Sequence, residues 1–249
     1  RLRQQHLAGW TRVQLEALLG PAAPTTGIIP ADPLLLRAPA AAESAADWPA
    51  PDPLVRPCWT DGSCIFPRDP VLRRAAWAVC AGGPPVAVAA AMVPGRQTIG
   101  RAELAALVWC SRGPLARPTV DAKYLVNVLQ HTGRPGAAQL AGANGDLWLL
   151  LARPIKPAWI KAHLSEEAAV AAGFSAVDWW GTAAADEAAH RLALAATPSP
   201  ALIHRRRRTE AAAVALRASL SAVQERAIDL NRTVRGVRRR VHKPLWRRP

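Results

Sequence analysis

Four acidic residues occupy positions from which their carboxylates can meet, although they lie far apart in the sequence: Asp61, Glu103, Asp121 and Asp186. Asp61 and Asp121 end two expected strands, and the carboxyl ends of strands line the ligand crevice of an open sheet with parallel neighbours. Glu103 lies one turn inside a long expected helix, and Asp186 opens a later one. Converged carboxylates repel one another unless divalent cations lie between them, and oxygen ligands suit Mg²⁺ or Mn²⁺. Two such ions form the clamp used for phosphodiester cleavage.

Three of these acids also have ordinary structural explanations. Asp121 and Asp186 suit the N-termini of helices, where the helix dipole favours a negative charge. Glu103 is within reach of a surface ion pair with Arg96 or Arg101. Each explanation is the commoner one for a single residue, so the motifs around the acids must decide.

Asp61 raises its own question, because it interrupts the strand-like stretch CWTDGSCIF over residues 58–66. A buried carboxylate without a partner is costly in free energy. Asp61 therefore either opens a turn with Gly62, since Asp-Gly is a common turn pair, or faces something positive.

The elements expected to position these residues alternate in type. Periodicity and turn signals predict strands and helices in the order β-β-β-α-β-α-α-β-α. The strands are expected over 55–61, 73–81, 86–93, 116–121 and 157–164, and the helices over 98–113, 123–131, 144–153 and 182–196. Asn144 is a plausible N-cap, and a loop of about 18 residues precedes the last helix. This order predicts an α/β fold with a mixed sheet covered by helices.

Charge and composition divide the chain into three parts. The 249 residues carry a net charge of +14, and residues 205–249 contain 14 Lys and Arg against three acidic residues. We expect an N-terminal helix and a Pro/Ala-rich linker over 1–54, a domain over 55–196 and a basic C-terminal helix or tail over 197–249. Such a tail is typical of nucleic-acid binding, and a solvated charged extension is the alternative.

Several classes of protein are disfavoured. The uncharged run over 75–95 is broken by Gly82–Pro85, so it predicts two strands and a turn, and we expect no membrane partner. Four cysteines without a CxxC pair argue against zinc and favour reduced thiols in an intracellular protein, in the nucleus or the cytoplasm. No signal peptide is evident, and a chain that begins at Arg1 is expected to be a piece of something longer.

The ordered motifs of the chain resemble those of the ribonuclease H family, in the bacterial-like type that also forms a domain of retroelement reverse transcriptases. The resemblance covers about residues 55–196. It rests on a set of motifs that occur in the family's order: TDGS at 60–63, TIGRAEL at 98–104, VDAKYLV at 120–126, NGDLW at 144–148, WIKAH at 159–163 and GTAAADEAA at 181–189.

The resemblance implies a ribonuclease H-like fold with a mixed five-stranded sheet, three antiparallel strands first and parallel strands after them. It implies that Asp61, Glu103, Asp121 and Asp186 bind two Mg²⁺ ions, with Mn²⁺ as the alternative. His163 matches a mobile histidine that helps proton transfer near product release; a histidine satisfied at a strand end is the other interpretation. The implied reaction is hydrolysis of the RNA strand of an RNA–DNA hybrid, with Gly62 keeping the backbone small beside the substrate.

The sequence departs from the family pattern at several positions, and the family residues at two of them, 99 and 100, contact the nucleic-acid backbone. The family's usual polar residues are replaced at four positions: Ile99, Gly100, Ala122 and Thr182. The basic handle of some members is missing, and we expect the basic tail to replace it. The alternative is a catalytically inactive module that only binds nucleic acid. An integrase or transposase core matches the motifs less well. We expect an upstream or fused reverse transcriptase in a retroelement polyprotein, with a free-standing host enzyme as the alternative.

Overall fold

The computed structural model describes residues 10–20, 48–50, 57–113 and 117–241, and the side chains of all of these except residue 12 and residues 234–241. The chain forms two compact units, one of residues 37–198 and one that combines residues 1–36 with 199–249. The expected segments were 1–54, 55–196 and 197–249. Here residues 1–36 share a unit with the C-terminal segment, and residues 37–54 belong to the larger unit. The expected linker before residue 57 lies almost wholly outside the described residues.

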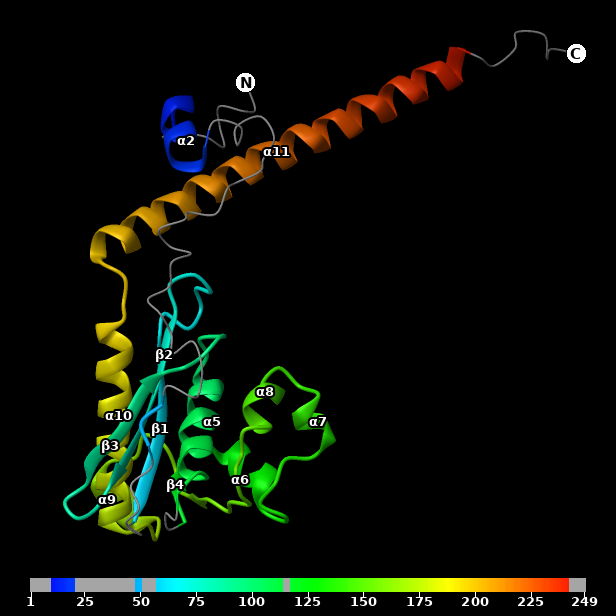
Figure 1. Cartoon of the computed structure of the whole chain (residues 1–249). Helices are drawn as coiled ribbons and strands as arrows, with labels where there is room; N and C mark the ends of the chain where they lie inside the picture. Colours follow the sequence, from blue (N-terminus) through cyan, green and yellow to red (C-terminus); the bar gives the residue numbers. More distant parts are fainter. Residues whose placement is uncertain (1–9, 21–47, 51–56, 114–116, 242–249) are drawn as a thin grey trace, which may run out of the picture. The chain divides into compact units, whose positions relative to one another are not determined.

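A mixed five-stranded sheet forms the centre of the larger unit (Figure 1), with the spatial order β3-β2-β1-β4-β5. Its strands are β1 (Cys58–Ile65), β2 (Arg74–Ala81), β3 (Val86–Met92), β4 (Thr119–Val120) and β5 (Ala158–Trp159). The pairs β1–β2 and β2–β3 are antiparallel, while β1–β4 and β4–β5 are parallel. The expected mixed sheet, antiparallel first and parallel after, is confirmed.

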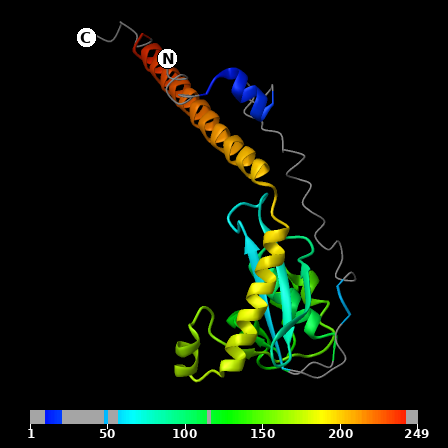
Figure 2. The same cartoon turned by 90° about the vertical axis from the view of Figure 1, so that its left-hand side faces the viewer.

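Helices cover both faces of this sheet (Figure 1). α5 (Ile99–Cys110) packs on one face against β1 and β2, and α10 (Ala176–Ala195) packs on the other against β1, β2 and β3. Figure 2, seen from the side of α10, shows this helix lying across the strands. The shorter helices of the unit are α6 (Lys123–Leu129), α7 (Ala137–Leu140), α8 (Gly145–Trp148) and α9 (Glu166–Ala171).

The main hydrophobic core lies between the sheet and α5. Three tryptophans meet in it, with ring centroids 5.0 Å apart for Trp48 and Trp77 and 6.1 Å apart for Trp77 and Trp109. Leu104 and Leu107 of α5 are fully buried beside them. Because aromatic rings remove large apolar areas from water, this cluster anchors α5 firmly to the sheet.

Two glycines let the helices approach the sheet closely. Gly62 lies inside β1, where a Cβ would be 2.5 Å from the backbone nitrogen of Glu103 and 2.7 Å from the Cβ of Ala102. Gly181 of α10 faces the ring of Trp59, and a Cβ there would overlap the ring. The structure therefore corrects the expectation for Gly62: it makes room for the backbone of α5, not for a substrate.

The first strand is longer than expected at its carboxyl end. β1 continues to Ile65, so Asp61 lies within the strand and pairs with Ala78 of β2. The alternative that Asp61 opens a turn with Gly62 is wrong, because both residues keep extended, paired backbone.

The last helix of the larger unit begins earlier than expected, at Ala176 instead of residue 182. Ser175 caps it, because the Ser175 side chain accepts a hydrogen bond of 3.0 Å from the backbone N–H of Asp178. Asp186 consequently lies in the third turn of α10 and does not open the helix. Most of the expected loop before residue 182 is helical, since α9 and the start of α10 lie in it.

The segment between α6 and β5 also differs from the expectation. The helix predicted over 144–153 is only the four-residue α8, and α7 precedes it where no helix was predicted. Asn144 stands at the N-cap position of α8, but its side chain makes no capping hydrogen bond.

The smaller unit pairs two helices, α2 (Arg12–Leu19) and α11 (Pro200–Val241). Leu15 and Leu19 of α2 are buried together with Ala213 and Leu216 of α11. This apolar contact explains why the N-terminal segment groups with the basic helix. Across the described residues, no helix is both long enough and apolar enough to span a membrane.

We expect Gly62→Ala to lower the free energy of unfolding by about 1–3 kcal/mol, because the added methyl group overpacks the β1–α5 contact. The matched control is Gly100→Ala in the first turn of α5. A Cβ at Gly100 would have the Tyr124 hydroxyl as its nearest neighbour at 3.5 Å, an ordinary contact, and alanine favours a helix. Urea denaturation measures both variants, and equal losses would contradict the explanation.

Candidate metal centre

Three carboxylates from separate elements meet at the sheet: Asp61 of β1, Glu103 of α5 and Asp121, which directly follows β4. One carboxylate oxygen of each lies within 4.8 Å of those of the other two. The strand register explains why two of them meet. Thr60 of β1 pairs with Val120 of the parallel strand β4, so the next residues, Asp61 and Asp121, lie side by side. We call these three residues the acid triad.

Asp186 meets two members of the triad, Asp61 and Asp121, at a cavity. The cavity has a volume of about 150 Å³ and is bordered by Asp61, Asp121 and Asp186. The charge of Asp186 raises the pKa values of both Asp61 and Asp121, so its carboxylate lies close to theirs. The structure therefore brings together all four acids singled out from the sequence.

Burial and mutual repulsion destabilise the ionised forms of the triad. Burial, followed by the charge of Asp121, raises the pKa of Asp61 to about 9. Burial, again followed by the charge of Asp121, raises the pKa of Glu103 to about 7. Burial also raises the pKa of Asp121. A cation among these oxygens would stabilise the ionised forms, and hard oxygen ligands fit Mg²⁺ or Mn²⁺. The residues present thus fit a divalent metal.

His163 borders the same cavity from the loop after β5. Its backbone has a φ of 56°, a left-handed conformation that is uncommon for residues other than glycine. Its positive charge lowers the pKa of Asp121, opposing the effect of burial. The side chain is exposed, and no hydrogen bond of its ring to another described residue is found. A histidine satisfied at a strand end therefore does not describe it.

The other five acidic residues between 61 and 186 have different surroundings. Asp69 accepts two backbone hydrogen bonds within a turn. Asp146 forms an ion pair, and Asp178 bonds the Ser175 side chain at the start of α10. Glu166 and Glu167 lie in the first turn of α9. The acids at the cavity are therefore set apart from the other five, each of which has a different structural setting.

The ordinary explanations offered for the triad do not hold. The N-cap of α6 is Ala122, and no side chain caps this helix. Within the part of the chain that the structure describes, no ion pair joins Glu103 to Arg96 or Arg101. Arg101 instead pairs with Asp146 of α8.

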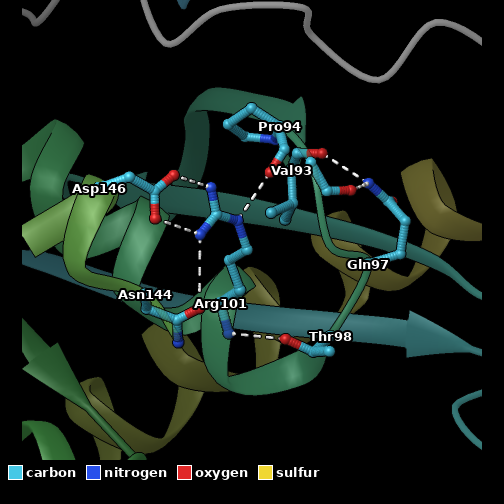
Figure 3. A network of polar contacts seen from close by, with 8 residues as sticks. Val93, Pro94, Gln97, Thr98, Arg101, Asn144 and Asp146 are labelled. Atoms are coloured by element: carbon cyan, nitrogen blue, oxygen red, sulfur yellow. Dashed lines mark hydrogen bonds and ion pairs between the residues drawn. The ribbon is translucent and has the colours of Figure 1, made fainter. Parts of the chain in front are cut away.

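The pairing of Arg101 holds the first turn of α5 in place (Figure 3). The Arg101 side chain is 5% exposed and forms a two-pronged ion pair with Asp146. Its Nε donates a hydrogen bond of 2.7 Å to the carbonyl of Pro94, and its backbone N–H donates one of 3.3 Å to the Thr98 hydroxyl. Because the triad glutamate follows two residues later, this network sets the helix turn that presents it.

The sequence analysis missed two side chains at the cavity, Trp179 and Lys161. Trp179 precedes Asp186 by seven residues, so both lie on one face of α10. This spacing was visible in the sequence, but the expected helix began only at residue 182. Thr182, noted as a departure from the family pattern, lines the cavity from the same face.

No model of a known protein family matches the chain, and a search of curated proteins finds no match.

We expect the stability of the metal-free chain to fall as pH rises from 5 to 9. Asp61 has a pKa of about 9 in the folded protein against an ordinary 3.8, so its protonated form favours the folded state, and this stabilisation is lost as pH rises towards 9. Asp61→Asn removes this loss, because asparagine does not ionise. The free energy of unfolding of the variant should therefore rise relative to that of the wild type, by up to about 1.4 kcal/mol for each unit of pH.

Chemical denaturation in EDTA at several pH values measures this difference. Glu187→Gln is the control, since Glu187 is exposed and forms an ion pair of 3.3 Å with Arg191. A difference between Asp61→Asn and wild type that does not change with pH would show that Asp61 is not held protonated.

Proposed function

We propose that the chain is a metal-dependent endonuclease of the ribonuclease H type, which hydrolyses the RNA strand of RNA–DNA hybrids. The observation that carries the proposal is the convergence of carboxylates that are distant in sequence: Asp61, Asp121 and Asp186 border one cavity of a mixed sheet, and Glu103 lies within 4.8 Å of Asp61 and Asp121. The ordered motifs that resemble ribonuclease H contain these four residues.

The geometry supports metal-assisted hydrolysis more than any reaction by protein groups alone. Among the described residues at the cavity there is no cysteine or serine, and the hydroxyl of Thr182 donates a hydrogen bond of 2.9 Å to the backbone carbonyl of Asp178. The acid triad instead offers hard oxygen ligands at short range. A pair of divalent ions, when bound, supplies activation of water and stabilisation of the leaving oxygen.

The chain's own residues then have distinct tasks. Asp61 offers its carboxylate at the cavity that Asp121 and Asp186 also border. Lys161 borders the cavity with an exposed side chain and supplies a positive charge for a substrate phosphate. His163, exposed at the same border, holds or moves a proton where the product leaves.

The choice of an RNA–DNA hybrid rests on the resemblance, since members of that family use the 2′-hydroxyl to distinguish RNA from DNA. The same resemblance suggests a retroelement polyprotein with a reverse transcriptase as the chain's context. The basic helix α11 supports a nucleic-acid partner, because it concentrates positive charge on one element.

We expect Asp61→Asn to reduce cleavage of a labelled RNA–DNA hybrid in Mg²⁺ by at least about 100-fold, because it removes the central carboxylate of the site. Glu187→Gln, one residue beyond Asp186 on α10, should leave the rate within about twofold of wild type. Loss of folding does not explain the expected inactivity, since Asp61→Asn should be the more stable protein at neutral pH when no metal is bound, and circular dichroism in the assay buffer checks that it is folded.

Two outcomes of this assay would refute the proposal. If the wild type cleaves with neither Mg²⁺ nor Mn²⁺ yet binds the hybrid, the chain is an inactive binding module. If Asp61→Asn retains full activity, cleavage occurs elsewhere.

We expect His163→Ala to reduce the turnover of the hybrid by about 10- to 100-fold while leaving the affinity for the hybrid unchanged, because His163 acts on a proton and not on binding. Steady-state kinetics separate kcat from KM and so distinguish the two roles. A weaker affinity with unchanged kcat would assign His163 to substrate binding instead.

A further inference from the structure

An apolar stripe on α11 extends well beyond the contact with α2. α2 covers the stripe where Ala213 and Leu216 are buried. Further along the helix, Val223 is 45% exposed and Leu230 is 55% exposed. Large apolar side chains repeated along one exposed face of a long helix usually mark a contact surface.

The spacing of the stripe is that of a coiled coil. From Ala213 onward, apolar residues recur in the sequence at alternating intervals of three and four: Ala213, Leu216, Leu220, Val223, Ala227, Leu230, Val234, Val237 and Val241. α11 runs helical through all these positions. A strict period of 3.5 residues over four heptads is typical of a seam between two helices, whereas a helix on a globular core presents a broader face. We call the positions from Leu220 to Val241 the seam.

We propose that the seam pairs with the same seam of a second copy of this chain, as a parallel coiled coil. The pairing is continuous with the α2–α11 contact, which already uses the first heptad of the same pattern. It is independent of the nuclease activity proposed above.

The charges beside the seam fit a parallel pairing of two copies. In a parallel dimer, a residue that directly precedes the first seam position of a heptad on one helix faces the residue five positions later on the other helix. This shift places Ser219 opposite Gln224, Arg226 opposite Asn231 and Thr233 opposite Arg238. Each facing pair contains at most one cation, so no two arginines oppose each other.

Arg240 also flanks the seam, whereas Arg232, Arg235 and Arg239 occupy outer positions of the heptad. Arg232 forms an ion pair of 3.9 Å with Asp229 on its own helix. The segment nevertheless has more basic than acidic residues. Two copies therefore repel at long range, and added salt should strengthen the dimer by screening this repulsion.

The test compares two double variants of the full chain by sedimentation equilibrium, after removal of nucleic acid. Val223→Asn with Leu230→Asn changes two positions of the seam. Val214→Asn with Ile228→Asn changes two residues outside it that are equally exposed, at 55% and 45%. Both variants carry the same kind of substitution on the same helix, and circular dichroism should show equal helix content.

We expect the wild type and the outer variant to approach twice the 26.6 kDa mass of one chain as concentration rises. The seam variant should dimerise at least about tenfold more weakly, because asparagine at two seam positions replaces buried apolar contacts with polar groups. Added salt should favour the dimer.

Three results would overturn the proposal. The wild type could stay at the single-chain mass up to its solubility limit, which would leave the seam to a different partner, such as an acidic helix. The two double variants could weaken dimerisation equally. Added salt could dissociate the dimer, which would indicate bridging by a polyanion instead of apolar pairing.

Discussion

Repulsion among buried carboxylates is the constraint on which the larger unit depends. Asp61 is 6% exposed inside a central strand, and the pKa of this residue is raised by burial and by Asp121. A sheet alone gains nothing from such a residue, because it weakens the core around it. A divalent cation would compensate the charge and make the arrangement favourable. Without one, the buried acids lower the stability of the fold.

The rest of the unit keeps the acids at fixed positions despite this repulsion. The parallel pairing of β1 with β4 aligns Asp61 with Asp121. The glycine after Asp61 lets α5 approach closely enough to present Glu103, and the buried Arg101 fixes the turn from which Glu103 extends. Each of these features fixes the position of the backbone. This suits a site whose carboxylates must be held at short oxygen-to-oxygen distances.

The sequence indicated the strands and the identities of the four acids, because strand alternation and motif order are local patterns. It did not predict the start of α10, since Ser175 and Asp178 form a capping signal that the glycine and tryptophans after it obscure. It also assigned Gly62 to the substrate, because close approach by a helix distant in sequence leaves no local pattern. The pairing of α2 with α11 was equally invisible, as it joins opposite ends of the chain.

The anchoring of α10 fixes more than its beginning. Asp178 accepts hydrogen bonds from the indole of Trp59 at 2.9 Å and from the Thr119 hydroxyl at 3.3 Å, which ties the first turn of the helix to two strands. Asp186 follows two turns later, so its direction is set by the count of residues between them. One residue inserted or deleted in that interval would rotate the carboxylate by about 100° around the helix axis. The eight-residue spacing from Asp178 to Asp186 therefore determines the direction in which the Asp186 side chain extends from the helix. This part of the chain should tolerate substitutions far better than changes in length.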